Sequence, residues 1–360
     1  MKKQWIVIPT LLVLGMIVAV AIVPVLQRAW DEYRARKEVV VDRAMRIKTI
    51  DTLVAELNDH YVFPEKAKQI EAVLRQRLKE GKYDRITNGY RLARQLTADI
   101  HGAARDLHLK VWFHPRLALP GEADGPAPAT QAQWEQRNNF ITRMIMRHTA
   151  SRSVKKVDRL NPGIGYLEIS SFPDAFLMAE KYAAAMDELA DTAGLIVDLR
   201  HNGGGDPQAV VLLISYFVDQ RTRLNDIWDR ETGNTVQHWT DDKLDGKRYG
   251  GKKPVLILVG PRTASAGEDF AYTMQALKRA TVVGEPTWGG AHPAAPYRIG
   301  EHFFAVIPGQ RSISPITGTN WEGVGVTPDI AATPARALVV ARNLMRRRLH
   351  GTAPLVAAGR

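Results

Sequence analysis

The residue most able to do covalent chemistry in this chain is Ser265. It lies in the stretch Thr-Ala-Ser-Ala-Gly-Glu, after the apolar run 255–259 and before a helix predicted at 269–277. A serine at such a strand-to-helix turn presents its hydroxyl at the rim of a sheet, where backbone N–H groups and the helix N-terminus favour developing negative charge. Ser265 and Glu268 also fit a helix capping box, which needs no chemistry. The stretch alone therefore leaves two interpretations open.

A glycine-rich stretch, Asp198-Leu-Arg-His-Asn-Gly-Gly-Gly205, follows a second predicted buried strand. Glycines let the backbone approach a ligand closely, and consecutive N–H groups form a site for anions. No Gly-Lys-Ser/Thr follows, so this is not a Walker phosphate loop. An oxyanion hole, a phosphate site and a structural turn all remain open from the residues alone.

A histidine and a glutamate could complete a catalytic group. His108 lies at the edge of a strand predicted at 109–113, where an imidazole can act as a general base. Glu322 lies in a late glycine-rich stretch, where a carboxylate can orient a catalytic histidine. Structural roles are common for both residue types, and other histidines compete for the base, namely His101, His114, His201 and His292. No spacing typical of a zinc site occurs, and we expect neither a metal nor a cofactor.

The amino terminus predicts a membrane segment. Residues 5–26 contain no charged side chain and follow two lysines, which suits an anchor whose amino terminus stays in the cytoplasm. A cleaved signal peptide, with Ala19 and Ala21 near the cleavage site, is the alternative. Either reading places residues from about 30 onward outside the cytoplasm, in the periplasm of a bacterial cell. The chain has no cysteine, which excludes disulfides and a thiol nucleophile.

The 360 residues and 45% hydrophobic content are ample for a core, and the net charge of +11 is spread along the chain. No basic-aromatic motif accompanies the charge, so nucleic acid is not an expected partner. The pattern predicts a segment at 1–29, a helical subdomain at 30–114, a flexible and partly helical connector at 115–162, an α/β core at 163–348 and a tail at 349–360. Alternating strands and helices from Gly163 favour the α/β class.

Taken in order, these stretches resemble the tail-specific, or C-terminal processing, serine peptidases. Further pieces that match are the segments 165–169, 283–287 and 323–329. The segments 61–67 and 81–84 resemble the modules of interphotoreceptor retinoid-binding protein. The resemblance implies a crotonase/ClpP-like core behind a helical N-terminal subdomain.

The same resemblance implies roles for individual residues. Ser265 matches the nucleophile, and the oxyanion donors would be Gly204 or Gly205 together with Ala266. Many members use a lysine about 25 residues after the serine, but this chain has Gly290 there. Another branch, similar to the tricorn protease, uses serine, histidine and glutamate, and His108 and Glu322 match those places. We therefore predict a Ser265–His108–Glu322 triad.

The family's PDZ domain is absent from the pattern, because the interval 115–162 is too short to hold one. Substrate selection would then come from the segments 115–132 or 221–250, or from partners. The predicted function is a membrane-anchored serine peptidase of the cell envelope that acts on proteins or peptides. The alternatives are a non-catalytic module that binds fatty acids or retinoid-like ligands, and a scaffold for an envelope partner. A homo-oligomer is left open.

Overall fold

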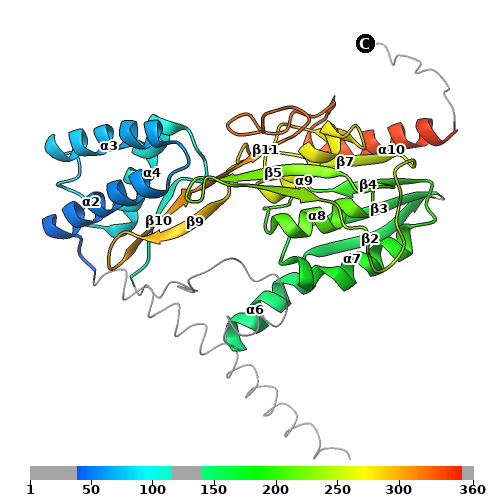
Figure 1. Cartoon of the computed structure of the whole chain (residues 1–360), viewed down its shortest axis with the longest axis horizontal. Helices are drawn as coiled ribbons and strands as arrows, with labels where there is room; N and C mark the ends of the chain where they lie inside the picture. Colours follow the sequence, from blue (N-terminus) through cyan, green and yellow to red (C-terminus); the bar gives the residue numbers. More distant parts are fainter. Residues whose placement is uncertain (1–38, 116–139, 162, 351–360) are drawn as a thin grey trace, which may run out of the picture.

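The chain folds into two lobes that are joined by extended strands (Figure 1). The computed structural model describes residues 39–115, 140–161 and 163–350. The predicted membrane segment at 5–26 and all but the first residue of the segment 115–132 lie outside these residues. Within the described ranges, no helix combines the length and the apolar character needed to cross a membrane.

The N-terminal lobe is built around three helices and one strand, as predicted for this region: α2 (Arg43–His60), α3 (Pro64–Lys79), α4 (Gly89–Ala104) and β1 (Lys110–Phe113). Local signals fix the helix ends. Asp42 accepts the N–H of Met45 at the start of α2, and Asn88 accepts that of Arg91 at the start of α4. Pro64 occupies the first helical position of α3, where its missing N–H costs nothing.

A hairpin from the second half of the chain completes this lobe. Strands β9 (Ala294–Arg298) and β10 (Phe303–Pro308) form an antiparallel sheet in the order β1-β10-β9. Phe303, Ala305 and Ile307 are buried in the same apolar cluster as α2 and α4. The sequence analysis assigned these residues to the α/β core and predicted no strands there, because their partner β1 lies almost 200 residues earlier.

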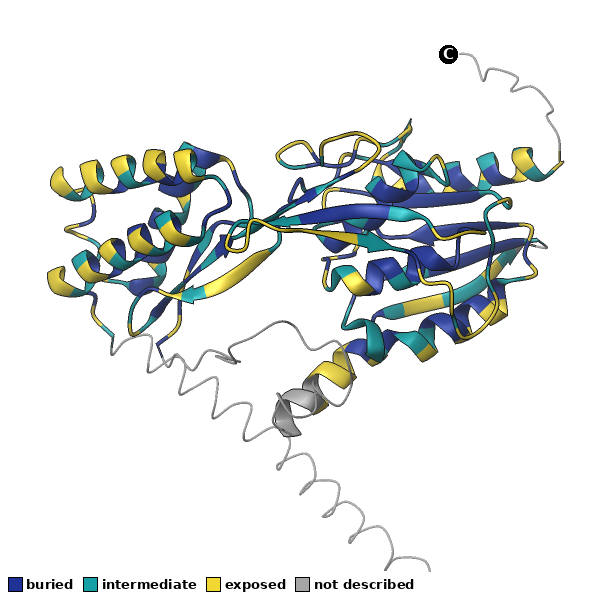
Figure 2. Cartoon of the chain, in the orientation of Figure 1, coloured by how far each residue is buried: buried dark blue, intermediate teal, exposed yellow. Residues whose placement is uncertain are grey.

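The core lobe is built around a six-stranded sheet in the order β12-β8-β7-β4-β3-β2, with only the β2–β3 pair antiparallel. Its strands are β2 (Val154–Asn161), β3 (Ile164–Ile169), β4 (Gly194–Asp198), β7 (Val255–Val259), β8 (Thr281–Gly284) and β12 (Ile330–Ala331). The apolar run 255–259 and the buried strand predicted before the glycine-rich stretch correspond to β7 and β4. Side chains of β4 and β7 alternate between two apolar clusters, so these strands are buried on both faces (Figure 2).

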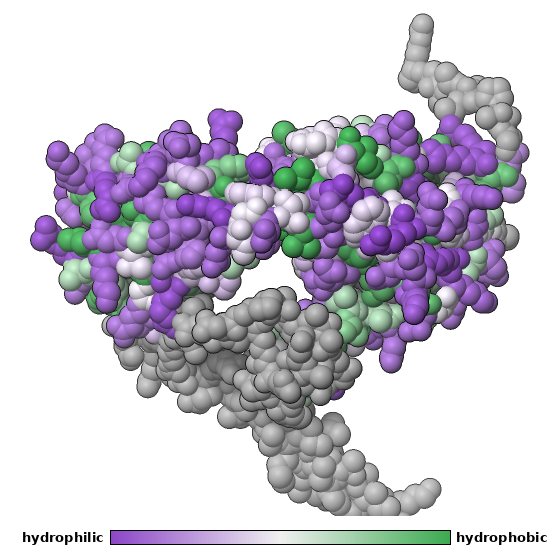
Figure 3. Space-filling view, in the orientation of Figure 1, coloured by the Kyte–Doolittle hydropathy of each residue, from purple (hydrophilic) through white to green (hydrophobic). Residues whose placement is uncertain are grey.

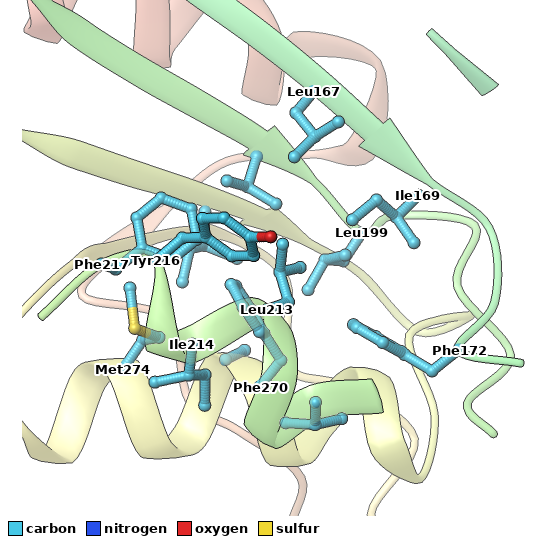
Figure 4. Close-up of a cluster of buried hydrophobic side chains, with 14 of the residues drawn as sticks. Leu167, Ile169, Phe172, Leu199, Leu213, Ile214, Tyr216, Phe217, Phe270 and Met274 are labelled. Atoms are coloured by element: carbon cyan, nitrogen blue, oxygen red, sulfur yellow. The ribbon is translucent and has the colours of Figure 1, made fainter. Parts of the chain in front are cut away.

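Helices cover both faces of this sheet. The face with Leu195 and Val197 packs against α7 (Ala175–Leu189), α8 (Pro207–Ser215) and α9 (Ala266–Ala276). Figure 4 shows the centre of this layer, where Phe172 and Phe270 lie near each other. The other face packs against α10 (Pro334–His350), whose Ala337, Ala341 and Met345 are buried there.

Strand β2 lies inside the segment that the sequence analysis treated as a connector, after α6 (Phe140–Ser151). Its residues Lys155, Lys156 and Arg159 are exposed and charged. Such residues suit an edge strand, because charge there discourages pairing with another chain. They also hide the alternation by which strands are usually recognised.

A third, smaller sheet has the order β11-β5-β6 and contains β5 (Arg223–Asp229), β6 (Thr235–Trp239) and β11 (Gln310–Ile313). The antiparallel β5–β6 pair lies within the segment 221–250, which the sequence analysis named as a possible source of substrate selection. Asn225 on β5 donates to Asp269 on α9 at 2.6 Å, which fixes this sheet to the core lobe. Hydrophilic side chains cover much of the visible surface of both lobes, in keeping with the high charge (Figure 3).

Candidate active site

Ser265 stands on a strained turn between β7 and α9. Its backbone has φ 51° and ψ −120°, a conformation that residues with a Cβ rarely adopt. Backbone strain of this kind costs about 1–3 kcal/mol and gathers at functional sites. The same strand–turn–helix arrangement presents the nucleophile in α/β-hydrolases. The turn places Ser265 at the carboxyl end of the parallel sheet.

Glu268 holds this turn from below. Its carboxylate is fully buried and accepts the N–H of Ser265 at 2.8 Å, that of Gly289 at 2.6 Å and that of Gly290 at 3.0 Å, together with the hydroxyl of Thr287. The predicted contact between Glu268 and the N–H of Ser265 is therefore present. Glu268 also does more than cap a helix, because it ties the nucleophile turn to the backbone of Gly289 and Gly290.

The glycine-rich loop after β4 lies directly against Ser265. A Cβ on Gly204 would come within 2.7 Å of the Ser265 Cβ, so only glycine fits at that position. The N–H of Gly204 is donated to the Asn202 side chain at 2.9 Å. Among the described residues, the N–H groups of Gly205 and Ala266 have no acceptor, and both residues line one pocket with Ser265. The geometry thus favours Gly205 and Ala266 as oxyanion donors over Gly204.

Asn202 is a residue whose importance the sequence analysis did not identify. Its side chain also donates to the Ile169 carbonyl at 3.1 Å, and its own carbonyl accepts the N–H of Ala264 at 2.9 Å. It therefore joins β3, the glycine loop and the nucleophile turn. Its full burial, unusual for an amide side chain, is visible only in the structure.

His108 reaches the same pocket from the other lobe, since it lies between α4 and β1. Burial lowers the pKa of its imidazole to about 4, so it is neutral near pH 7, as a base must be. Its Nδ1 is buried without a hydrogen-bond partner among the described residues, and the residue lines the pocket. His108 and Ser265 share the pocket without a direct hydrogen bond between them.

The pocket has a volume of about 310 Å³ and lies at the junction of the two lobes. Its wall is mostly apolar, with Asp269 and Ser312 as further polar residues. The complete lining is His108, Gly205, Pro207, Ile227, Ser265, Ala266, Asp269, Gly290, Ala291, Pro293, Ala294, Val306, Ser312 and Trp321. An apolar cleft with a few converging polar groups is the usual form of a site for small ligands or side chains.

Glu322, the third predicted member, lies behind this pocket. Its Oε2 accepts the N–H of Ala291 at 2.6 Å and lies 3.3 Å from Nδ1 of His292. Its Oε1 is buried and has no partner among the described residues. Burial raises the pKa of Glu322 to about 7, and the negative charge of Asp106 adds to the effect. The structure therefore pairs Glu322 with His292 and shows no contact between Glu322 and His108.

Gly290 is the residue that the resemblance sets at the position of a family lysine. A Cβ there would lie 2.6 Å from Cε1 of His108 and 2.4 Å from the ring of Trp288. A side chain at 290 would therefore collide with the histidine. This supports the interpretation that His108 replaces a lysine base, because the two cannot occupy the site together.

The sequence analysis treated His292 only as a competitor for the base and gave Asp106 no role. Asp106 Oδ2, His292 Nδ1 and Glu322 Oε2 lie within 4.8 Å of one another, a set that could in principle hold a metal ion. Nδ1 of His292 is hydrogen-bonded to Asp106 Oδ2 at 3.0 Å and lies 3.3 Å from Glu322 Oε2, so direct contacts among the three side chains account for the cluster. The position of Asp106, two residues before His108, was the one local signal available.

Two family models match the chain. The model for peptidase family S41 matches residues 163–332, and the model for the N-terminal domain of S41 peptidases in eukaryotic IRBP, the interphotoreceptor retinoid-binding protein, matches residues 34–147. The boundary between them falls close to the boundary between the N-terminal helices and the core sheet.

Curated relatives match mainly over the core lobe. Carboxyl-terminal-processing peptidase 2 of Arabidopsis thaliana is 28% identical over 178 residues, which are 47% of this chain and 32% of the relative. The tricorn protease of Thermoplasma volcanium is 30% identical over 182 residues, 48% of this chain and 15% of the relative. The matched region is thus about a third of these relatives or less.

Among solved structures, a protein from Parabacteroides merdae has a TM-score of 0.55 at 17% identity, with 84% of this chain and 96% of that chain covered. At this identity the likeness shows the fold alone, an α/β core with a helical N-terminal region. Because both S41 models match in order along a chain with this fold, the chain belongs to peptidase family S41, whose members are serine-type peptidases, and has an N-terminal domain like that of eukaryotic interphotoreceptor retinoid-binding protein.

Proposed function

We propose that this chain hydrolyses peptide bonds in protein or peptide substrates through an acyl intermediate on Ser265. The observation that carries the proposal is the strained turn of Ser265, in a pocket it shares with a neutral histidine and two unpaired N–H groups. A residue that served only as a helix cap would need neither the strain nor these neighbours. Family membership supplies the reaction class, and the curated relatives include carboxyl-terminal-processing peptidases.

The proposed reaction begins when Ser265 Oγ attacks the carbonyl carbon and His108 Nε2 takes the hydroxyl proton. The carbonyl oxygen becomes negative and is held by the N–H groups of Gly205 and Ala266. As the C–N bond breaks, His108 returns the proton to the departing amine. Water then attacks the acyl-serine, again with His108 as the base, and releases the acid product.

Glu322 is proposed to orient His108. Both Nδ1 of His108 and Oε1 of Glu322 are buried polar atoms without partners among the described residues. Buried polar atoms are normally satisfied, so a bond between these two, direct or through a water molecule, would complete the group. A Cβ added to Gly290 would meet His108, and the N–H of the next residue, Ala291, is donated to Glu322, so both side chains lie beside one short backbone segment.

A fluorophosphonate probe, which reacts with activated serines, tests this proposal on the full-length chain in detergent. We expect the wild type to be labelled, labelling to vanish in Ser265→Ala, and Ser314→Ala, a buried serine outside the pocket, to label normally. A folded wild type that does not label would reject the peptidase and favour a non-catalytic module for hydrophobic ligands.

We also propose that residues 5–26 anchor the chain in a membrane and that both lobes lie on the extracytoplasmic side. The support is the uncharged run of 22 residues after two lysines. Expression in a bacterium with two membranes, followed by protease treatment of spheroplasts, is the test. Membrane-bound protein that is digested from outside would agree, whereas full protection or a soluble mature form would contradict the anchor.

A further inference from the structure

We propose that His292 is a positioning residue that joins Glu322 to Asp106 across the junction of the lobes and so sets how Glu322 is presented to His108. This inference rests on the proposed peptidase function. It assigns a role to a buried histidine that does not line the pocket itself.

The first argument is the geometry around the His292 ring. Nδ1 lies 3.0 Å from Asp106 Oδ2 and 3.3 Å from Glu322 Oε2. The side chains of His292 and Asp106 are only 4% and 2% exposed. One buried ring nitrogen thus stands between two carboxylates, which would repel each other without it.

The second argument is the origin of the contacts. Asp106 belongs to the N-terminal lobe, where it also accepts the backbone N–H of His108 at 3.1 Å and the hydroxyl of Tyr61 at 3.2 Å. Glu322 belongs to the loop between β11 and β12 of the core lobe. His292 itself lies between β8 and β9, where the chain passes from one lobe to the other. It therefore fixes the base-bearing segment relative to the predicted orienting carboxylate.

Other contacts also hold the lobes together. Arg230 on the β5–β6 hairpin donates to the backbone carbonyls of Asn58 and Tyr61 at the end of α2. Loss of His292 should therefore leave the two lobes joined. We expect the Glu322 carboxylate to shift in position and in pKa, while the two lobes stay in contact.

The ionisation of Glu322 supplies a readout that a merely structural role would not move. His292 lowers the pKa of Glu322, while burial and Asp106 raise it. The other titratable groups that face this cluster are Tyr61, His108 and Glu268, and Lys110 acts on His108. If ionised Glu322 assists His108, the labelling rate rises through pH about 7, and removal of His292 shifts that rise to higher pH.

The experiment measures fluorophosphonate labelling rates from pH 5 to 9 for the wild type, His292→Asn and His292→Leu. Asn keeps an N–H donor near the Nδ1 position but carries no charge, whereas Leu keeps neither. We expect His292→Leu to lose about tenfold in rate, no more than the loss expected when Glu322 itself is neutralised, because His292 acts through that carboxylate. His292→Asn should lose less of the labelling rate than His292→Leu does. The pH at the midpoint of the rate profile should increase from the wild type to His292→Asn to His292→Leu.

His60→Asn is the matched control, because His60 stacks on Tyr297 and pairs with Glu56, away from the cluster. Equal rates and midpoints in the wild type and His292→Leu would overturn the proposal. So would equal losses in both variants with an unmoved midpoint, since that is the mark of a structural role. If His292→Leu does not fold, the midpoint of His292→Asn decides the question alone.

A measurement that needs no activity separates this proposal from the peptidase proposal. The pH dependence of thermal unfolding should differ between the wild type and His292→Asn around pH 7. If the wild type never labels but this difference is present, the peptidase fails and the link between His292 and Glu322 stands. If the wild type labels and the two unfolding profiles coincide, the peptidase stands and the link fails.

Discussion

The two sides of the predicted catalytic group are held in different ways. On the core side, Ser265 is fixed within one lobe by Glu268, which accepts the N–H groups of Ser265, Gly289 and Gly290, all within 22 residues of it in the sequence. On the N-terminal side, His108 depends on Asp106, whose other partners lie 45 and 186 residues away in the sequence. A nucleophile built by local hydrogen bonds is thus opposed by a base that only the assembly of two lobes can place.

This difference predicts which substitutions should affect the fold and the reactivity together and which should affect reactivity alone. Substitution of Glu268 should displace the nucleophile and destabilise the core lobe together, because its buried carboxylate accepts hydrogen bonds from both. A change around His108 should reduce reactivity while most of the fold persists. The following variants test this contrast.

Removal of Glu268 should have the largest effect. Glu268→Ala leaves three buried N–H groups and the Thr287 hydroxyl without their acceptor. Since each unpaired buried group costs about 1–3 kcal/mol, we expect the free energy of unfolding to fall by roughly 3 kcal/mol or more and labelling to disappear. Urea denaturation of this variant and of Glu180→Ala, an exposed site on α7, gives the comparison. Similar midpoints would contradict the central role of Glu268.

Removal of the base should leave the fold nearly intact. His108→Ala takes away a side chain whose Nδ1 has no partner among the described residues, so little hydrogen bonding is lost. We expect the labelling rate to fall about 10²- to 10⁴-fold, the usual contribution of a general base. In the wild type, the fall in rate due to His108 protonation should lie near pH 4 and not near 6.5, because burial lowers the pKa of His108 to about 4.

His201→Ala, an exposed histidine in the glycine-rich stretch, is the control for that experiment. If His201→Ala slows labelling and His108→Ala does not, the base has been assigned to the wrong histidine. The same profile is measured in Glu322→Gln, which removes the change in rate that ionisation of Glu322 produces near pH 7; a fall centred at pH 6.5 in that variant would contradict the buried, neutral state of His108.

The close approach of the glycine loop can be tested with two neighbouring positions. In Gly204→Ala the new Cβ would lie 2.7 Å from Ser265 Cβ and 2.9 Å from the Ala264 carbonyl oxygen, at φ 96°. In Gly203→Ala the new Cβ has no neighbour within 4 Å. We expect Gly204→Ala to reduce labelling about 100-fold through displacement of the nucleophile and Gly203→Ala to have little effect. Equal labelling of the two variants would show that the glycine-rich loop can move to accommodate a Cβ at position 204 without displacing Ser265.

The smallest effect on labelling is expected from Glu322→Gln, about tenfold at pH 8 and less at pH 5.

The pKa of Glu322 is raised to about 7, so its protonated form is favoured in the folded state. Its contribution to stability is therefore present below pH about 4.5 and is lost as the pH rises through 7. We expect the wild type to lose up to roughly 3 kcal/mol over that range relative to Glu322→Gln.

Urea denaturation at several pH values measures this difference, with Glu301→Gln, which is 81% exposed, as the control. If the profiles of the wild type and Glu322→Gln run parallel, Glu322 does not titrate near pH 7. In that case the proposed pH dependence of labelling would need another source.

The sequence by itself determined the parts of this protein that depend on nearby residues. The helix starts at Pro64 and Asn88, the buried strands at 194–198 and 255–259, and the nucleophile turn all follow from capping, alternation and backbone preference over a few residues. The glycine-rich stretch was also identified as a close backbone approach. Within it, the structure favours Gly205 because Asn202 takes the N–H of Gly204.

Only the tertiary structure decided which distant residues meet. Strands β9 and β10 complete the N-terminal lobe although they follow the core strands, and β2 joins the core from a segment without strand-like alternation. His292 stands beside Glu322 and Asp106, while the predicted contact of Glu322 with His108 remains a prediction. Capping and alternation act over one or two turns of chain, whereas contacts between residues 106, 292 and 322 arise from packing, which the order of residues does not encode locally.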